Sequence, residues 1–164
     1  MTFRSKDQKP QDGPKQPDEF FQELSRIADI EQYLARALAF AAEKIPAAKV
    51  SAVLLDNPVE GATVRIAWQK NIGRIFDFKY SSSLLKQLSV NEPFFFTPRI
   101  ADPTLSQSVE NITSALLVPL SGGQGRIGVL YMDNRGRITP FTEEDLKLAA
   151  GLGKAIALKL SAGK

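Results

Sequence analysis

The sequence predicts a single α+β domain, and two observations lead to this prediction. Two pairs of segments alternate between apolar and polar residues, at 49–69 and 112–133, and a turn rich in Gly, Asn or Pro divides each pair. Such period-two alternation is typical of strands with one buried face. Helical patterns precede the first pair and follow the second, at 18–45 and 142–161. The order helix, hairpin, irregular stretch, hairpin, helix therefore predicts helices combined with antiparallel hairpins.

Composition is that of a globular protein. The chain has 164 residues, of which 43% are hydrophobic and 24% charged, and this is enough for one compact core. No apolar run approaches the roughly 18 residues of a membrane helix, and the N-terminus lacks the apolar stretch of a secretory signal. We therefore expect a cytoplasmic protein with no membrane partner. The net charge of +3 is small, and without a basic reading motif we expect no nucleic-acid partner.

The chain contains no cysteine and no histidine. The first absence excludes disulfides, thiolate metal sites, thioether-linked cofactors and cysteine nucleophiles. The second removes the Ser-His-Asp triad, most zinc chemistry and histidine-ligated haem. We accordingly expect no metal, no cofactor and no catalytic residue, with an enzyme based on carboxylates or lysine as the remaining catalytic alternative.

The N-terminal part predicts a flexible arm and then helical structure. Residues 1–17 are rich in Lys, Gln, Asp and Pro and cannot bury enough surface to offset their ordering entropy, so the domain itself is expected at 18–164. Asp29 followed by Gln32 has the spacing of a capping box. The segment 18–45 is therefore one bent helix or two helices that meet near Asp29.

The rest of the domain alternates regular and irregular segments. Residues 70–111 are the least regular. The last helix begins with Thr142 and Asp145 in capping positions, and its apolar residues cover more than the face needed for contact with one layer. The remaining predicted elements are strands at 49–56, 62–69, 93–97, 112–120 and 126–133 and a short helix at 82–89.

Three local motifs favour structural roles. The turn at 121–125 lacks the Gly-Lys-Ser/Thr ending of a phosphate loop and precedes a strand. The carboxylates of Glu143, Glu144 and Asp145 lie in a first helical turn, where the helix dipole favours negative charge. Residues 133–135 (Asp-Asn-Arg) end a strand and are interpreted as a turn.

Several of these segments together resemble one known family. Residues 114–120 (Ser-Ala-Leu-Leu-Val-Pro-Leu), 127–134 (Ile-Gly-Val-Leu-Tyr-Met-Asp-Asn) and 141–146 (Phe-Thr-Glu-Glu-Asp-Leu) resemble the C-terminal half of a GAF domain. Residues 50–56 (Val-Ser-Ala-Val-Leu-Leu-Asp) resemble its N-terminal half, so that the resemblance covers about 29–161. It implies an antiparallel sheet of five or six strands with the first and last helices on one face. The irregular middle segment would cover the other face and form a ligand pocket.

The sequence lacks the residues on which several activities of the GAF family depend. The cyclic-nucleotide signature Asn-Lys-x-x-x-Phe-x-x-x-Asp-Glu does not occur. Bilin attachment and methionine sulfoxide reduction use cysteine in this family, and haem binding uses histidine. The resemblance therefore implies a module without these chemistries.

A small-molecule site is expected at the middle segment. Arg99 could hold an anion by a forked contact, and Tyr80 and Phe95 could supply an apolar wall. Alternatively the rings belong to the core, and Arg99 with Asp102 is a surface pair of little energetic value. The candidate ligand-binding residues are Tyr80, Phe95, Arg99, Asp102 and Ser114.

Two function classes follow. One is a regulatory sensor that binds an unidentified small molecule. The other is an interaction module in which the helices at 18–45 and 142–161 build a homodimer and the pocket is vestigial. Either would signal through a partner protein. The candidate dimer residues are Phe20, Leu24, Ile27, Leu148, Leu152 and Ile156.

Overall fold

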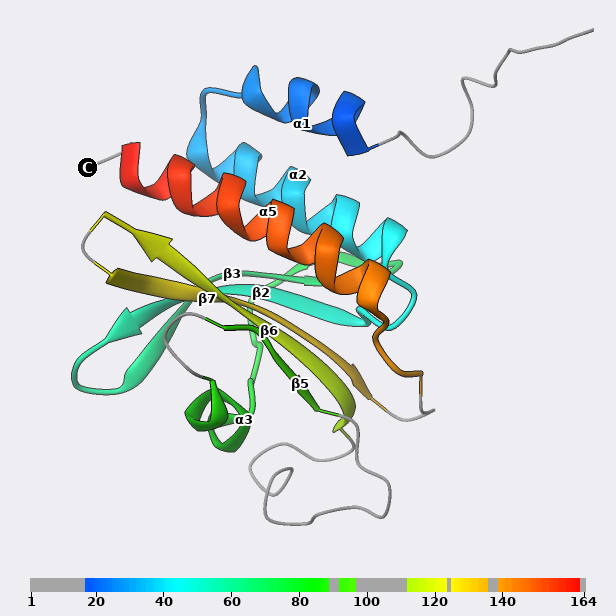
Figure 1. Cartoon of the computed structure of the whole chain (residues 1–164), viewed down its shortest axis with the longest axis vertical. Coiled ribbons are helices and arrows are strands. Elements are labelled where there is room, and N and C mark those ends of the chain that lie inside the picture. The colour runs from blue at the N-terminus through cyan, green and yellow to red at the C-terminus, as the bar shows by residue number, and fades with distance from the viewer. Residues whose placement is uncertain (1–16, 89–91, 97–111, 124, 136–138, 163–164) are drawn as a thin grey trace, which may run out of the picture.

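A six-stranded sheet with helices on both sides forms the framework of the computed structural model (Figure 1). Its strand order is β4-β3-β2-β7-β6-β5, and every neighbouring pair is antiparallel. The strands are β2 (Val50–Asn57), β3 (Gly61–Gln69), β4 (Gly73–Ile75), β5 (Phe94–Phe96), β6 (Ile112–Gly122) and β7 (Gly125–Arg135). The helices are α1 (Pro17–Ser25), α2 (Ile30–Lys44), α3 (Ser82–Gln87) and α5 (Glu143–Ala162). The structure describes residues 17–88, 92–96, 112–123, 125–135 and 139–162; the arm predicted at 1–17 lies outside them except for its last residue.

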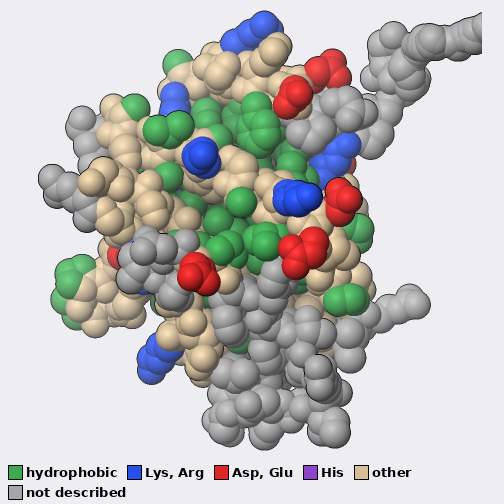
Figure 2. Space-filling model, in the orientation of Figure 1, with side chains coloured by type: hydrophobic (Ala, Val, Ile, Leu, Met, Phe, Trp, Pro, Cys, Tyr) green, Lys and Arg blue, Asp and Glu red, His purple; other side chains and the backbone are tan. Residues whose placement is uncertain are grey.

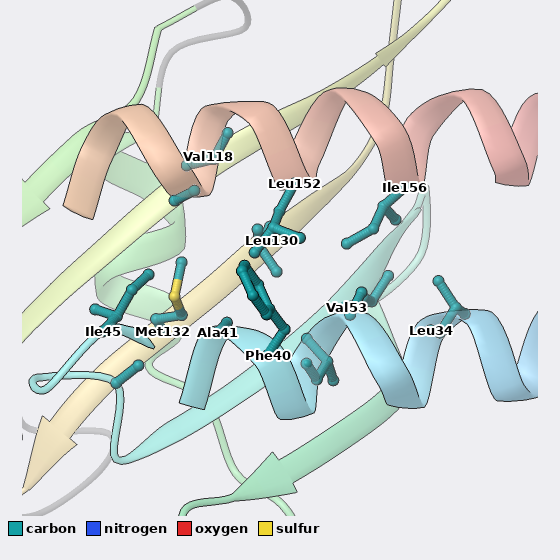
Figure 3. Close-up of a cluster of buried hydrophobic side chains, with 14 of the residues drawn as sticks. Leu34, Phe40, Ala41, Ile45, Val53, Val118, Leu130, Met132, Leu152 and Ile156 are labelled. Atoms are coloured by element: carbon teal, nitrogen blue, oxygen red, sulfur yellow. The ribbon is translucent and has the colours of Figure 1, made fainter. Parts of the chain in front are cut away.

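The predicted placement of the terminal helices is confirmed. In Figure 1, α1, α2 and α5 lie on one side of the sheet, and α3 lies on the other. We call these two sides of the sheet the helical face and the second face. The core on the helical face joins α2 and α5 to the sheet, as the close-up in Figure 3 shows for Leu34, Phe40, Val53, Leu130, Leu152 and Ile156 among others.

The N-terminal helical segment is two helices rather than one bent helix. The Asp29 carboxylate accepts a hydrogen bond from the backbone N–H of Gln32 at 2.9 Å and thereby caps α2. The rings of Phe20 and Phe40 stack at 3.7 Å between centroids. This stack holds α1 against α2.

The start and the packing of α5 agree with the sequence pattern. The N–H of Thr142 donates to the Asp145 carboxylate at 2.9 Å, and the N–H of Asp145 donates to the Thr142 hydroxyl at 3.1 Å, so the predicted capping pair is confirmed. Further along, a Cβ added at Gly153 would lie 3.1 Å from the Val118 side chain. The glycine therefore allows α5 to approach β6 closely.

The last two strands are longer than the pattern indicated. β6 passes through Pro119, which pairs with Val129, and continues to Gly122. Proline is tolerated there because, among the described residues, β5 pairs only with 115–117 of β6 and no strand pairs with the same edge of β6 at Pro119. β4 was not predicted at all, because its three residues are too few to show a period.

Candidate functional site

The second face of the sheet is apolar over most of its area. The α3 residue Leu84 is fully buried against it. The buried residues on this face are Ala52, Leu54, Ala62, Ala67, Leu84, Leu88, Ile112, Ala115, Leu117, Val129 and Tyr131.

Tyr131 of β7 brings a polar group into this apolar layer. Its side chain is fully buried. Its hydroxyl donates to the Asp133 carboxylate at 2.7 Å and accepts the backbone N–H of Ser81 at 3.1 Å. The rings of Phe78 and Tyr80 meet it edge-on, with centroids at 5.7 and 6.3 Å. The hydroxyl thus joins the segment before α3 to the centre of the sheet.

Asp133 and Arg135 complete the polar centre. Asp133 has no exposed surface. Its two carboxylate oxygens accept hydrogen bonds from Arg135, at 2.9 Å from Nε and 3.0 Å from Nη2. Nη2 also donates to the Lys79 carbonyl at 2.7 Å, and the guanidinium lies 5.6 Å from the centre of the Phe78 ring. We call Tyr131, Asp133 and Arg135 the polar triad, without implying catalysis.

Burial sets the protonation of the polar triad. Burial raises the pKa of Tyr131 well above its usual value, and the neighbouring Asp133 charge adds to this, so the phenol stays a hydrogen-bond donor. Burial also raises the pKa of Asp133, and the hydrogen bonds from Arg135 and Tyr131 oppose that rise. The triad is therefore a fixed set of donors and acceptors in an apolar layer.

Of the five predicted ligand residues, the structure places one on the second face. Tyr80 is half-buried there, and its hydroxyl donates to the Ala62 carbonyl at 3.2 Å. The backbone of Phe95 pairs with Leu116 in β5, and its side chain lies outside the described residues. Arg99 and Asp102 also lie outside them.

Ser114 does not join the Tyr80 group. Its side chain is fully buried, and its hydroxyl donates at 2.6 Å to the carbonyl of Thr139, in the segment that leads into α5. This hydroxyl therefore has a structural partner on the chain's own backbone.

Four of the six predicted dimer residues belong to the core of the chain itself. Side chains without exposed surface cannot contact a second subunit, which corrects the expectation for them: Phe20, Leu24, Leu152 and Ile156. Ile27 and Leu148 are partly exposed. Most of the apolar residues of α5 pack within the chain, against the sheet on one side and α1 and α2 on the other, whereas Leu158 is exposed. A hydrogen bond of 3.2 Å from the Tyr33 hydroxyl of α2 to the Ala155 carbonyl of α5 also joins these two helices.

The polar triad was missed because 133–135 was interpreted as a turn. That prediction is wrong: β7 continues to Arg135, which pairs with Ile112 of β6. A signal was present in the sequence, since Val129, Tyr131, Asp133 and Arg135 occupy alternate positions and so share one face of a strand. In this chain the Asp133 carboxylate and the Arg135 guanidinium neutralise each other within the strand and do not form a turn.

Several grooves border α5 on the helical side, including one along each of its sides. The α1–α5 groove has a volume of about 460 Å³ and is lined by Phe21, Ser25, Tyr33, Gly151, Lys154, Ala155, Leu158 and Lys159. The β6–α5 groove has a volume of about 560 Å³ and is lined by Pro93, Val118, Pro119, Ser121, Ala150, Gly153, Lys154, Ala157 and Leu158. Lys154 and Leu158 line both grooves, and Leu158 is 68% exposed.

The described part of the chain lacks two other kinds of feature. Within it, no three acidic, Cys or His side chains come together as ligands for a metal ion. None of its helices has the length and apolarity needed to cross a bilayer.

Comparisons with known proteins agree on the fold. A family model described as GAF domain matches residues 29–162. No curated protein matched the chain. The GAF domain of a phosphoenolpyruvate-protein phosphotransferase from Coxiella burnetii is 17% identical with a TM-score of 0.65, over 90% of this chain and 91% of that one. JSC1_58120g3, solved in a far-red absorbing state with bound biliverdin, is 11% identical with a TM-score of 0.67, over 89% and 97%. The chromophore-binding domain of a bacteriophytochrome from R. palustris is 11% identical with a TM-score of 0.66, over 89% and 59%.

Proposed function

Because this chain belongs to the GAF domain family, we propose that it is a non-catalytic regulatory module that binds a small molecule on the second face of its sheet. The observation that carries this proposal is the polar triad, whose Tyr131 and Asp133 side chains are fully buried in an otherwise apolar layer. Ligand sites commonly combine apolar walls with a few fixed polar groups. The aromatic rings of Phe78 and Tyr80 border the triad and supply such walls.

β7 offers a route from this site to the helices. Tyr131 and Asp133 face the site, whereas Leu130 and Met132 belong to the core on the helical face. A ligand that favours one position of β7 over another would therefore change the packing under α2 and α5. Such a shift requires a difference in affinity for two conformations.

The ligand is a small organic molecule with an apolar body and at least one polar group. Biliverdin is bound in one structural relative, where it belongs to that protein. This chain has no cysteine, so a bilin could bind only without a thioether bond. Biliverdin, cyclic nucleotides and metabolic carboxylates form a suitable panel of probes.

Thermal unfolding of the purified chain with each probe tests the proposal. A ligand at about 100 times its Kd adds roughly 2.7 kcal/mol to stability, or about 5–11 °C in Tm for a chain of this size. Arg135→Lys keeps the charge but loses the forked contact, and we expect it to reduce the shift. Lys147→Gln, on the exposed side of α5, is the matched control and should keep it. A shift unaffected by Arg135→Lys would place the ligand elsewhere.

A second role, self-association, is favoured by the exposed Leu158 and the α1–α5 groove beside it. We propose that this surface of α5 contacts a second copy of the chain. Leu158→Glu should then lower the dimer fraction in sedimentation velocity. Val59→Glu is the control, because Val59 is 89% exposed in the β2–β3 turn. A wild-type monomer at high concentration would contradict this role. Either role implies a cytoplasmic signalling partner protein.

A further inference from the structure

We propose that the β6–α5 groove binds a free long-chain monocarboxylate, with the apolar chain in the groove and the carboxylate at Lys154. This site lies on the helical side of the sheet and is separate from the proposed site at the polar triad, so the inference goes beyond the proposed function. Its support comes from the shape, the lining and the charge of the groove.

The groove has the size and lining of an apolar ligand site. Its volume of about 560 Å³ falls within the roughly 300–1,000 Å³ of small-molecule pockets. Seven of its nine lining residues are apolar or glycine, and it is more enclosed than the α1–α5 groove. Gly153 lines the groove without a side chain, and a Cβ there would lie 3.1 Å from the Val118 side chain. An alkyl chain would fill this space without leaving a polar group unsatisfied.

The neighbouring sheet edge disfavours a peptide strand as the occupant. β5 pairs with β6 as far as Leu117 and leaves the edge beyond it open in the described residues. Pro119 lies on that open edge and has no N–H to donate to an added strand. A ligand that needs apolar contact but no backbone hydrogen bonds fits this edge better.

Charge selects an anionic head group. Lys154 is the one charged residue among those lining the groove, and it forms no ion pair within the described residues. Figure 2 shows both basic and acidic side chains on this face of the molecule, among areas of exposed hydrophobic atoms. A carboxylate would pair with this ammonium group.

Calorimetric titration with three probes tests this chemistry. Dodecanoate below its micelle concentration carries both parts, dodecanol lacks the charge, and acetate lacks the chain. We expect saturable 1:1 binding of dodecanoate, about fivefold weaker binding of dodecanol, and no binding of acetate. Lys154→Gln should remove the preference for dodecanoate over dodecanol. Equal binding of the acid and the alcohol by the wild-type chain, or no saturable binding of dodecanoate, would overturn the proposal.

Two matched variants locate the site. Ala150 lines the β6–α5 groove only and Ser25 lines the α1–α5 groove only, and both are exposed. Ala150→Phe should fill the groove and weaken dodecanoate binding at least tenfold, while Ser25→Phe should leave it unchanged, with unfolding curves to verify that both fold. The reverse pattern would refute the location. Arg135→Lys should bind dodecanoate normally, so failure of one site is distinguishable from failure of the other.

Discussion

Asp133 and Arg135 neutralise each other from the same face of one strand. Residues two apart in a strand point to the same side, and here they form two hydrogen bonds, at 2.9 and 3.0 Å. Asp133 is fully buried, whereas the Arg135 side chain retains 28% exposure. The pair therefore carries its charge balance within β7 and needs no partner from a neighbouring strand.

Arg135→Gln should destabilise the fold more than the loss of a surface charge does. It leaves the buried Asp133 carboxylate without its cation, at a cost of about 3 kcal/mol in unfolding free energy. The double variant Asp133→Asn with Arg135→Gln removes the unpaired charge, so it should cost clearly less than the sum of the single changes. Urea unfolding measures all three variants. Additive effects would show that the two side chains do not interact in solution.

The stability contribution of Asp133 should fall as the pH rises. Because burial raises its folded-state pKa above the ordinary 3.8, the contribution is fully present below the unfolded pKa and is lost as the pH passes through the folded pKa. The wild type should therefore lose unfolding free energy relative to Asp133→Asn as the pH rises above about 4. Urea unfolding across a pH series checks this.

Glu31 serves as a control, because its contribution to stability should change with pH in the opposite direction to that of Asp133. The hydrogen bond from Arg65 lowers the pKa of Glu31 below its ordinary 4.5, with a further contribution from Arg74. Its stabilising contribution is present above the unfolded pKa and is lost as the pH falls through the folded pKa. The advantage of wild type over Glu31→Gln should thus shrink on acidification. If both variants followed the same trend, burial would not be the cause of the Asp133 shift.

Phe20→Ala should weaken the fold at every protein concentration. Phe20 is fully buried and stacks on Phe40, and removal of a buried ring costs about 3–5 kcal/mol. Val59→Ala, at an exposed position, should stay within about 0.5 kcal/mol of wild type. Chemical denaturation at two protein concentrations is the measurement. A Phe20→Ala effect that appears only at high concentration would return this residue to a dimer interface.

Sequence periodicity predicted the elements that are long and exposed on one side. The capping residues Asp29 and Thr142 mark helix starts in the structure as they do in the sequence. Periodicity could not predict β4, which is short, nor the length of β7, whose end carries polar residues. Tertiary contacts decide both cases: β4 exists because it pairs with β3, and Arg135 remains in a strand because it faces Ile112.

The candidate site was harder to predict than the fold for a physical reason. A single Tyr or Asp in a strand pattern does not reveal whether its face is covered. The Tyr131 hydroxyl accepts the N–H of Ser81, and Arg135 donates to the carbonyl of Lys79. These partners are 50 and 56 residues away along the chain and come close only after folding. The four buried residues of the predicted dimer set were misassigned for a related reason, because an apolar helix face is the same in sequence whether it meets a sheet or another subunit.

Gly128→Ala should be the most disruptive glycine substitution in the sheet. A Cβ at this position would lie 2.2 Å from the carbonyl oxygen of Leu54. That atom is backbone in the central strand β2, so it cannot rotate away as a side chain could, and β7 would have to move from β2. We expect a loss of about 3 kcal/mol in unfolding free energy, at the upper end of typical overpacking costs.

Gly123→Ala is the control, because a Cβ there has nothing within 4 Å. This substitution should change stability by no more than about 0.5 kcal/mol. Because β7 carries the polar triad, a folded Gly128→Ala variant should also show reduced thermal shifts with any ligand of the second face. Equal stability of the two variants would mean that β2 and β7 are further apart than this contact requires.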